Sequence, residues 1–276
     1  MSEARASLPE RDAELLALAG LTDLPPASEG LFRTGGWLRR ISGEQVLLFG
    51  GGRALLLEVA HPLVAAGVAQ HSDFRRDPLG RLRRTLDAMS TLTFADRARA
   101  LAAVRGIERS HQSIRGVLEE PVGAFAAGTA YDGRAPELIL WVWATLVDTS
   151  VLVYDQFVAP LDSAAREEFY ADQRAIARLL GVPSEQVPTS FGEFRAYFDA
   201  QVERGALCVG REAREIAASV LRPPRQLGDG GMLRLLTAAL LPEPLREAFE
   251  LPWDDARAQR FATLRESVRA LRKVAS

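Results

Sequence analysis

Apolar residues recur every three or four positions along most of this chain, and this spacing constrains the fold more than any other feature. In the segment 78–92, for example, one stripe consists of Leu79, Leu82, Leu86 and Met89. Such spacing places side chains on one face of an α-helix, which has 3.6 residues per turn. No segment alternates apolar and polar residues over the length of a strand. We therefore predict an all-α fold, a multi-helix bundle of roughly ten helices.

The length and composition allow one large hydrophobic core. The chain has 276 residues, of which 47% are hydrophobic, and a chain of this size buries most of its apolar surface. We predict an N-terminal helical extension over residues 1–42, followed by a single all-α domain over residues 43–276. The segment Glu137–Phe157 is the most apolar predicted helix. Gly50–Gly52 lacks the spacing of a phosphate-binding loop and is interpreted as a break between helices.

Charge and cysteine content exclude several classes of function. The net charge is −2 and the sequence pI is 6.0, so no basic surplus predicts nucleic-acid binding. Cys208 is the only cysteine, which excludes an internal disulfide. The N-terminal residues lack a secretory apolar segment, and the longest apolar runs are shorter than the ~18–20 residues of a membrane helix. We expect a cytoplasmic protein without a membrane span.

One histidine lies in the apolar stripe of a helix predicted over Phe94–Gly116, with Gly116 just beyond its last turn. The stripe consists of Val104, Ile107, His111 and Ile114. A histidine that faces a core is usually satisfied by a hydrogen bond, and less often it binds a metal. Periodicity alone leaves both explanations for His111 open.

Two Glu-x-x-His pairs raise the first metal hypothesis. Glu58 and His61 form one pair, and Glu108 and His111 form the other. In a helical bundle, two such pairs and two further carboxylates can hold two iron ions. Pro62 follows His61 directly, and Glu108 lies at the polar edge of its helix near arginines. The further carboxylates have no clear candidates, so a di-iron carboxylate oxidase or oxygenase is an alternative with incomplete ligands.

A haem is the second metal hypothesis. It needs only one histidine from a buried helix as an iron ligand, and arginines of a neighbouring helix can pair with its propionates. The helix over 78–92 supplies Arg81, Arg83 and Arg84. For Arg83 we favour an exposed ion pair with Asp87, four residues away.

Four ordered motifs resemble the MpaB/latex-clearing-protein oxygenase family. They are LLLEVAHPLVAAGVAQHSDFRRDPLGRLRRT, VRGIERSHQSIRG, YDGRAPELILWVWATLVDTSVLVYDQFVAPL and AREEFYADQRAIARLLGVP. They extend from about Gly43 to about Ala200, more than half of the chain. The resemblance implies a globin-like helical core that binds haem b. It also implies oxidative cleavage of carbon–carbon double bonds in isoprenoid chains by dioxygen.

The resemblance also implies roles for individual residues. His111 matches the iron ligand of the family. Other matching positions of the haem pocket are Arg81, Thr85 and Thr145, and Arg84 matches a lysine that approaches the iron. Because an arginine stays protonated, Arg84 is a poor iron ligand. Trp143 replaces a histidine that we expect in many relatives. We assign the catalytic base to Glu58, a lone carboxylate in an apolar run, and count Arg84 with it as catalytic.

These observations lead to a hypothesis about function. We predict a haem b-dependent oxygenase that uses dioxygen to cleave a C=C bond in an isoprenoid-like or other apolar small molecule. Without an export signal, polymeric rubber is an improbable substrate. A haem protein that binds an apolar ligand without turnover is a non-enzymatic alternative, because a fold does not determine a reaction. The apolar helices could support a homodimer.

Overall fold

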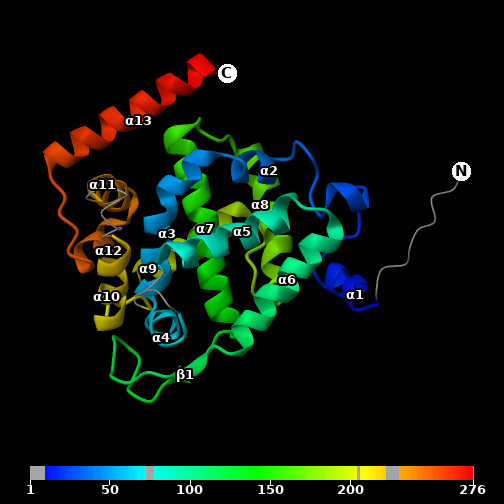
Figure 1. Ribbon diagram of the computed structural model, residues 1–276, viewed down its shortest axis with the longest axis horizontal. Coiled ribbons are helices and arrows are strands. Elements are labelled where there is room, and N and C mark those ends of the chain that lie inside the picture. The colour runs from blue at the N-terminus through cyan, green and yellow to red at the C-terminus, as the bar shows by residue number, and fades with distance from the viewer. Residues whose placement is uncertain (1–9, 73–77, 204–205, 222–229, 276) are drawn as a thin grey trace, which may run out of the picture.

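The computed structural model describes residues 10–72, 78–203, 206–221 and 230–275, and only the backbone of residues 78–82 and 275. The described part is almost wholly helical (Figure 1), which confirms the predicted all-α class. Its first half contains the helices α1 (Glu10–Leu18), α2 (Trp37–Ser42), α3 (Gly51–Ala60), α4 (Pro62–His71), α5 (Pro78–Phe94) and α6 (Arg97–Gln112), and the short 3-10 helices η1 (Ala27–Glu29) and η2 (Gln45–Gly50).

The second half of the chain begins with a small hairpin and continues as helices. The strands β1 (Arg115–Val117) and β2 (Ala130–Asp132) pair antiparallel, with Gly116 opposite Tyr131. The helices are α7 (Pro136–Phe157), α8 (Ser163–Leu179), α9 (Phe191–Glu203), α10 (Arg211–Val220), α11 (Gly231–Leu240), α12 (Glu243–Ala248) and α13 (Asp255–Ala275).

The predicted end of the long helix at Gly116 was wrong. Helix α6 ends at Gln112, and Gly116 lies within β1. A Cβ atom at Gly116 would lie 2.5 Å from the Tyr131 hydroxyl oxygen and 2.8 Å from Gln70 Oε1. The glycine is therefore required for close contact with the opposite strand. The two strands have only three residues each, too few for an alternating pattern to predict them.

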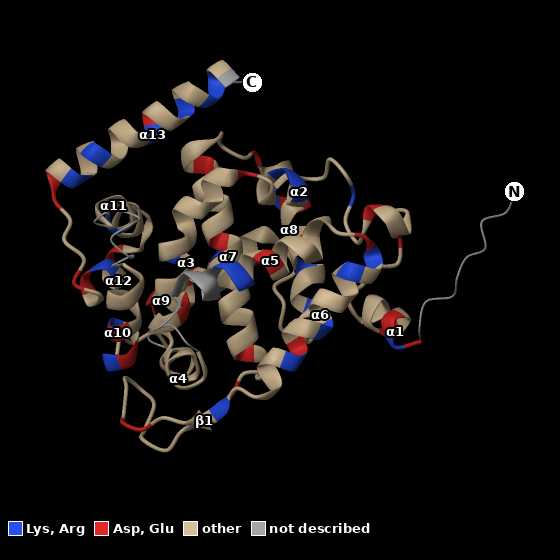
Figure 2. Cartoon of the chain, viewed as in Figure 1, with Lys and Arg blue, Asp and Glu red and all other residues tan. Residues whose placement is uncertain are grey.

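Helix α7 lies at the centre of the molecule, and the other helices surround it (Figure 1). Trp141, Trp143 and Phe157 are fully buried on it. Charged residues are concentrated on outer helices such as α6 and α13 (Figure 2). Helix α7 is also long and apolar enough to cross a membrane, but 72% of its most apolar window is buried inside the protein. Burial of this kind is expected for the central helix of a helical domain.

The chain turns sharply between α3 and α4. Gly50–Gly52 ends η2 and begins α3, as the sequence indicates, and the segments Gln45–Ala60 and Pro62–His71 meet at an angle of 106°. Pro62 is suited to the first position of α4 because a proline has no amide hydrogen to donate. Helix α5 then packs beside α6, and on its exposed face Arg83 pairs with Asp87 at 3.6 Å, as predicted.

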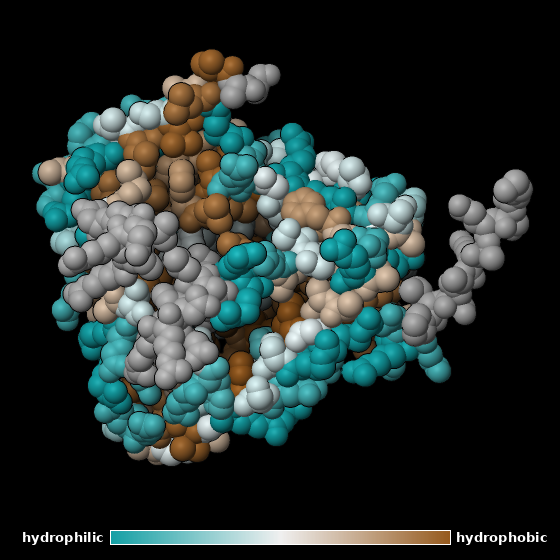
Figure 3. Space-filling model, in the orientation of Figure 1, coloured by the Kyte–Doolittle hydropathy of each residue, from teal (hydrophilic) through white to brown (hydrophobic). Residues whose placement is uncertain are grey.

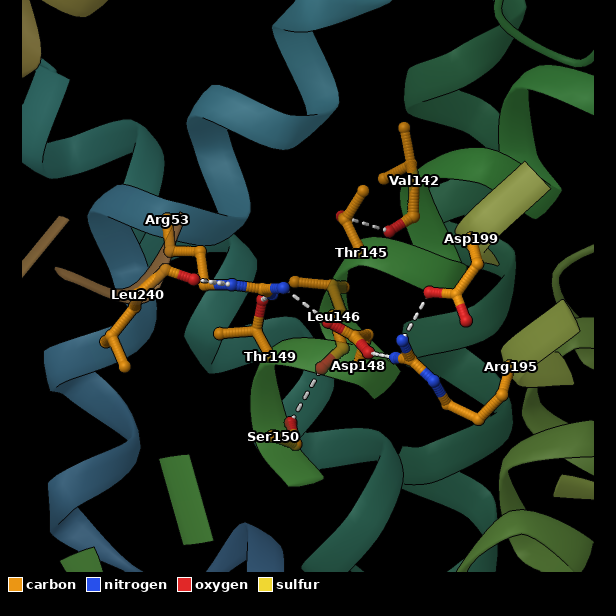
Figure 4. Close-up of polar contacts among 10 residues, drawn as sticks. All are labelled: Arg53, Val142, Thr145, Leu146, Asp148, Thr149, Ser150, Arg195, Asp199 and Leu240. Atoms are coloured by element: carbon orange, nitrogen blue, oxygen red, sulfur yellow. Dashed lines mark hydrogen bonds and ion pairs between the residues drawn. The ribbon is translucent and has the colours of Figure 1, made fainter. Parts of the chain in front are cut away.

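A buried ion pair joins α3 to α7 (Figure 4). The Arg53 guanidinium donates to the Asp148 carboxylate, to the Thr149 hydroxyl and, at 2.7 Å, to the Leu240 carbonyl. Asp148 also accepts from Arg195 of α9. Burial, and then the nearby charge of Arg195, lower the pKa of Arg53 to about 9. The fold therefore keeps a desolvated cation whose charge the carboxylate of α7 compensates.

Asp148→Asn should strongly destabilise the protein, because it leaves the buried Arg53 cation without its carboxylate. We expect a loss of about 3 kcal/mol in the free energy of unfolding. Asp199→Asn is the matched control, since Asp199 pairs with Arg195 at the surface, and should cost less than about 1 kcal/mol. Urea unfolding measures both variants, and equal losses would contradict the importance of the buried pair.

Candidate functional site

A cavity of 400 Å³ lies among α3, α4, α5, α6 and α7, and we call it the His111 cavity. From α6 it is lined by Ile107, Ser110 and His111, and Ile114 follows just after the helix. Three of the four residues of the stripe that was predicted from periodicity therefore line this cavity, and Val104 lies in the core. Most of the other lining residues are apolar. A cavity of this size is within the range of roughly 300–1,000 Å³ found for small-molecule sites.

The His111 imidazole has the properties of an available ligand. Burial lowers its pKa, so the ring is mainly neutral near pH 7 and keeps a nitrogen lone pair. The imidazole makes no hydrogen bond in the part of the chain that the structure describes, so the simpler explanation of a hydrogen-bonded core histidine has no support there. The donor chemistry fits one axial ligand of a haem iron.

Three other predicted site residues line the same cavity. Glu58 comes from α3 and is buried, with 8% of its surface exposed. Arg84 and Thr85 come from α5, and both are exposed to solvent. The structure thus brings an acid, a cation, a hydroxyl and an imidazole to one cavity from three helices.

Of the two remaining predicted residues, only Thr145 is placed by the structure, and it lies outside this group. The side chain of Arg81 lies outside the described residues. Thr145 is fully buried on α7, and its hydroxyl donates to the Val142 carbonyl at 2.7 Å (Figure 4). It lines neither the His111 cavity nor the second cavity described next. A role for Thr145 in a haem pocket therefore stays a prediction.

A second cavity, of 440 Å³, adjoins the first. Five residues line both, and they form the junction of the two cavities: Glu58, Thr85, Met89, Trp143 and Leu146. Three of the residues that line the second cavity are large hydrophobic residues exposed at the surface: Leu48, Leu86 and Phe94. Figure 3 shows hydrophobic residues on this face between α13 and the centre of the molecule. An apolar molecule could thus enter the second cavity and reach the junction.

His71 and Trp143 were not predicted as residues of the site, although Trp143 was noted as the replacement of a histidine. His71 lines the His111 cavity, and its Nε2 atom is 2.9 Å from the Arg115 carbonyl oxygen. Val64, Val68 and His71 follow the same spacing of three or four that identified His111, so this signal was available. Trp143 lies at the junction, and its indole nitrogen is buried without a hydrogen bond to any described residue.

The structure does not assemble the two Glu-x-x-His pairs. Glu108 is exposed and forms an ion pair with Arg11 at 3.4 Å. His61 lines neither cavity, and its ring lies 5.4 Å from that of Phe125. Among the described residues, no group of three or more His, Cys, Asp or Glu side chains could hold a metal ion. The described residues therefore give no support to a carboxylate-bridged pair of irons.

Comparison with known proteins identifies the class. Residues 38–272 match the family described as "ER-bound oxygenase mpaB/B'/Rubber oxygenase, catalytic domain". This match covers most of the chain, so the protein belongs to that oxygenase family. It begins at residue 38, inside the predicted N-terminal extension. No curated protein and no solved structure matched the chain.

His61 should make the stability of the protein depend on pH. Burial lowers its pKa to about 4 in the folded state, whereas histidine in an unfolded chain titrates near 6.5. Its contribution to stability is therefore complete above pH ~6.5 and is lost as the pH falls towards about 4. The free energy of unfolding of the wild type should decrease from pH ~7.5 to ~4.5, and protonation of His61 should account for about 2 kcal/mol of that decrease. His61→Leu should remove this part of the decrease. Urea unfolding at the two pH values measures it, and an unchanged decrease would contradict the assignment.

Proposed function

We propose that this protein is a haem b-dependent oxygenase that uses dioxygen to cleave a C=C bond in an isoprenoid-like or other apolar molecule. Membership of the oxygenase family supports the reaction class. The observation that carries the cofactor assignment is the His111 imidazole, which lines an apolar cavity, has a pKa lowered by burial and makes no hydrogen bond to any described residue. The adjoining second cavity supports an apolar substrate.

The residues of the His111 cavity fit a haem. His111 would hold the iron, because a neutral imidazole is a common axial ligand. Arg84 would pair with a propionate, because a guanidinium binds carboxylates through two hydrogen bonds. Thr85 follows Arg84 on the same helix and lines the same cavity. Arg81 and Thr145 are assigned to the haem pocket by resemblance alone. When bound, the haem would supply an iron that binds and activates dioxygen.

The residues at the junction would control the reaction. Glu58 is a buried carboxylate between the cofactor cavity and the second cavity, and it can accept or return a proton there. An arginine side chain does not serve as a base in proteins, so Arg84 would act only as a donor of hydrogen bonds. Met89, Trp143 and Leu146 provide apolar walls that exclude water from the double bond.

His111→Ala should abolish specific haem binding. We expect a loss of roughly 100-fold or more in haem affinity, because the variant removes the proposed axial ligand. Titration of the purified apoprotein with haem, followed by absorption, measures this affinity. His71→Ala is the matched control, since His71 lines the same cavity but already binds the Arg115 carbonyl. Loss of haem in His71→Ala with retention in His111→Ala would reverse the assignment.

Glu58→Gln should slow turnover without releasing the haem. Loss of a general acid or base typically costs 10²–10⁴-fold, and we expect a decrease of about 100-fold. Dioxygen consumption with an unsaturated isoprenoid such as squalene measures the rate, and the absorption spectrum reports the cofactor. Glu108→Gln, an exposed acid paired with Arg11, should retain the wild-type rate. If Glu58→Gln consumed dioxygen at the wild-type rate, the role of Glu58 as a proton donor or acceptor would be contradicted. If the wild type bound haem but consumed no dioxygen with the isoprenoid, the protein would be a binding protein and not an oxygenase.

A further inference from the structure

The second cavity contains a buried amide without a hydrogen-bond partner. Gln173 lies on α8, exposes 7% of its surface and lines this cavity. Its carboxamide makes no hydrogen bond in the described part of the chain, yet it is not among the fully enclosed polar atoms. Its remaining accessible surface therefore faces the cavity. An unpaired buried amide is costly, so each such group in a native protein requires an explanation, such as a bound ligand or water.

Three hydroxyl groups of the same cavity are already used in hydrogen bonds within the protein. The Thr149 hydroxyl accepts from Arg53. The Ser150 and Thr93 hydroxyls donate to backbone carbonyls of their own helices at 2.8 and 2.9 Å. Gln173 differs from all three because both its donor and its acceptor remain available to a ligand.

Gln173 also lies near the proposed reaction centre. Ile176, one turn further along α8, lines the same cavity, and Leu180 lines the His111 cavity. Tyr170, one turn earlier, packs against Trp143 with ring centroids 6.0 Å apart. A ligand held at Gln173 would therefore extend along the wall that leads to the junction of the two cavities.

The charges of the second cavity restrict the class of ligand. No lysine or arginine is among its described lining residues, whereas Glu44 and Glu58 are. A carboxylate or diphosphate would therefore enter without a cation among these lining residues to compensate its charge. A neutral hydroxyl or carbonyl can exchange hydrogen bonds with the Gln173 amide without this penalty.

We propose that Gln173 binds a neutral oxygen group, an alcohol, aldehyde or ketone, at one end of an isoprenoid-like substrate. The apolar chain would occupy the rest of the second cavity, with its double bond at the junction. This inference rests on the proposed function for the isoprenoid chain. It assigns Gln173 as the residue that distinguishes an oxygenated isoprenoid from a pure hydrocarbon.

The test compares three probes of similar chain length: farnesol, β-farnesene and farnesoic acid. Each is titrated by calorimetry, without dioxygen so that no turnover occurs, into the haem-reconstituted wild-type protein and two variants. Gln173→Leu removes the amide at similar volume. Gln45→Leu is the control, because Gln45 lines the same cavity but is exposed to solvent. Thermal unfolding of each protein without probe is measured in parallel.

The wild type should bind farnesol roughly 5- to 10-fold more tightly than farnesene, as expected for one added hydrogen bond, and more tightly than farnesoic acid. Gln173→Leu should bind farnesol and farnesene equally, and Gln45→Leu should keep the wild-type preference. Without probe, Gln173→Leu should melt at a higher temperature than the wild type, because it no longer buries an unpaired amide.

Several results would overturn the proposal: equal affinity of the wild type for farnesol and farnesene, a preference that survives in Gln173→Leu, or no binding of either. The absorption spectrum of the same samples reports the haem separately. If the protein bound no haem but showed the expected order of affinities, the haem assignment would be refuted and the role of Gln173 would stand. A haem protein without this order would refute the role of Gln173 alone.

Discussion

The buried pair between Arg53 and Asp148 is the interaction on which the arrangement of the site depends. It joins α3 to α7 in the core, where a charge without its partner would be very unfavourable. Glu58 lies further along α3, and Trp143 and Leu146 lie just before Asp148 on α7. By fixing these two helices against each other, the pair fixes three of the five residues at the junction of the two cavities.

The two cavities have different roles in the proposed function. The His111 cavity contains an imidazole and a cation, the groups that hold an iron porphyrin. The second cavity has apolar walls, an apolar surface around its opening and the buried Gln173 amide, which has no hydrogen-bond partner among the described residues. Glu58 is a buried carboxylate common to both. In the proposed function, the two adjoining cavities would bring an apolar chain to an oxygen-activating cofactor and would keep the reacting double bond away from water.

Much of this arrangement was predictable from the sequence, because it depends on local periodicity. The segment Glu137–Phe157 was predicted within one residue of α7. The spacing of Ile107, His111 and Ile114 placed them on one face, and that face lines the cavity. The resemblance placed Arg84 near His111, and the structure brings them to the same cavity.

The remaining features depend on contacts between distant segments, which periodicity does not report. Gly116 resembled a helix terminus because its close contact with Tyr131 is visible only once the strands pair. Gln173 resembled an ordinary polar residue of a helix, since a sequence does not show that an amide lacks a partner. The second cavity forms between helices that are far apart in the chain.

The most direct test of the central claim is the iron content and absorption spectrum of the wild-type protein after reconstitution with haem and, separately, with ferrous iron. We expect one haem iron per chain, with the intense absorption of an imidazole-bound haem, and no stoichiometric uptake of free iron. Two irons per chain without haem absorption would contradict it and would favour a di-iron centre.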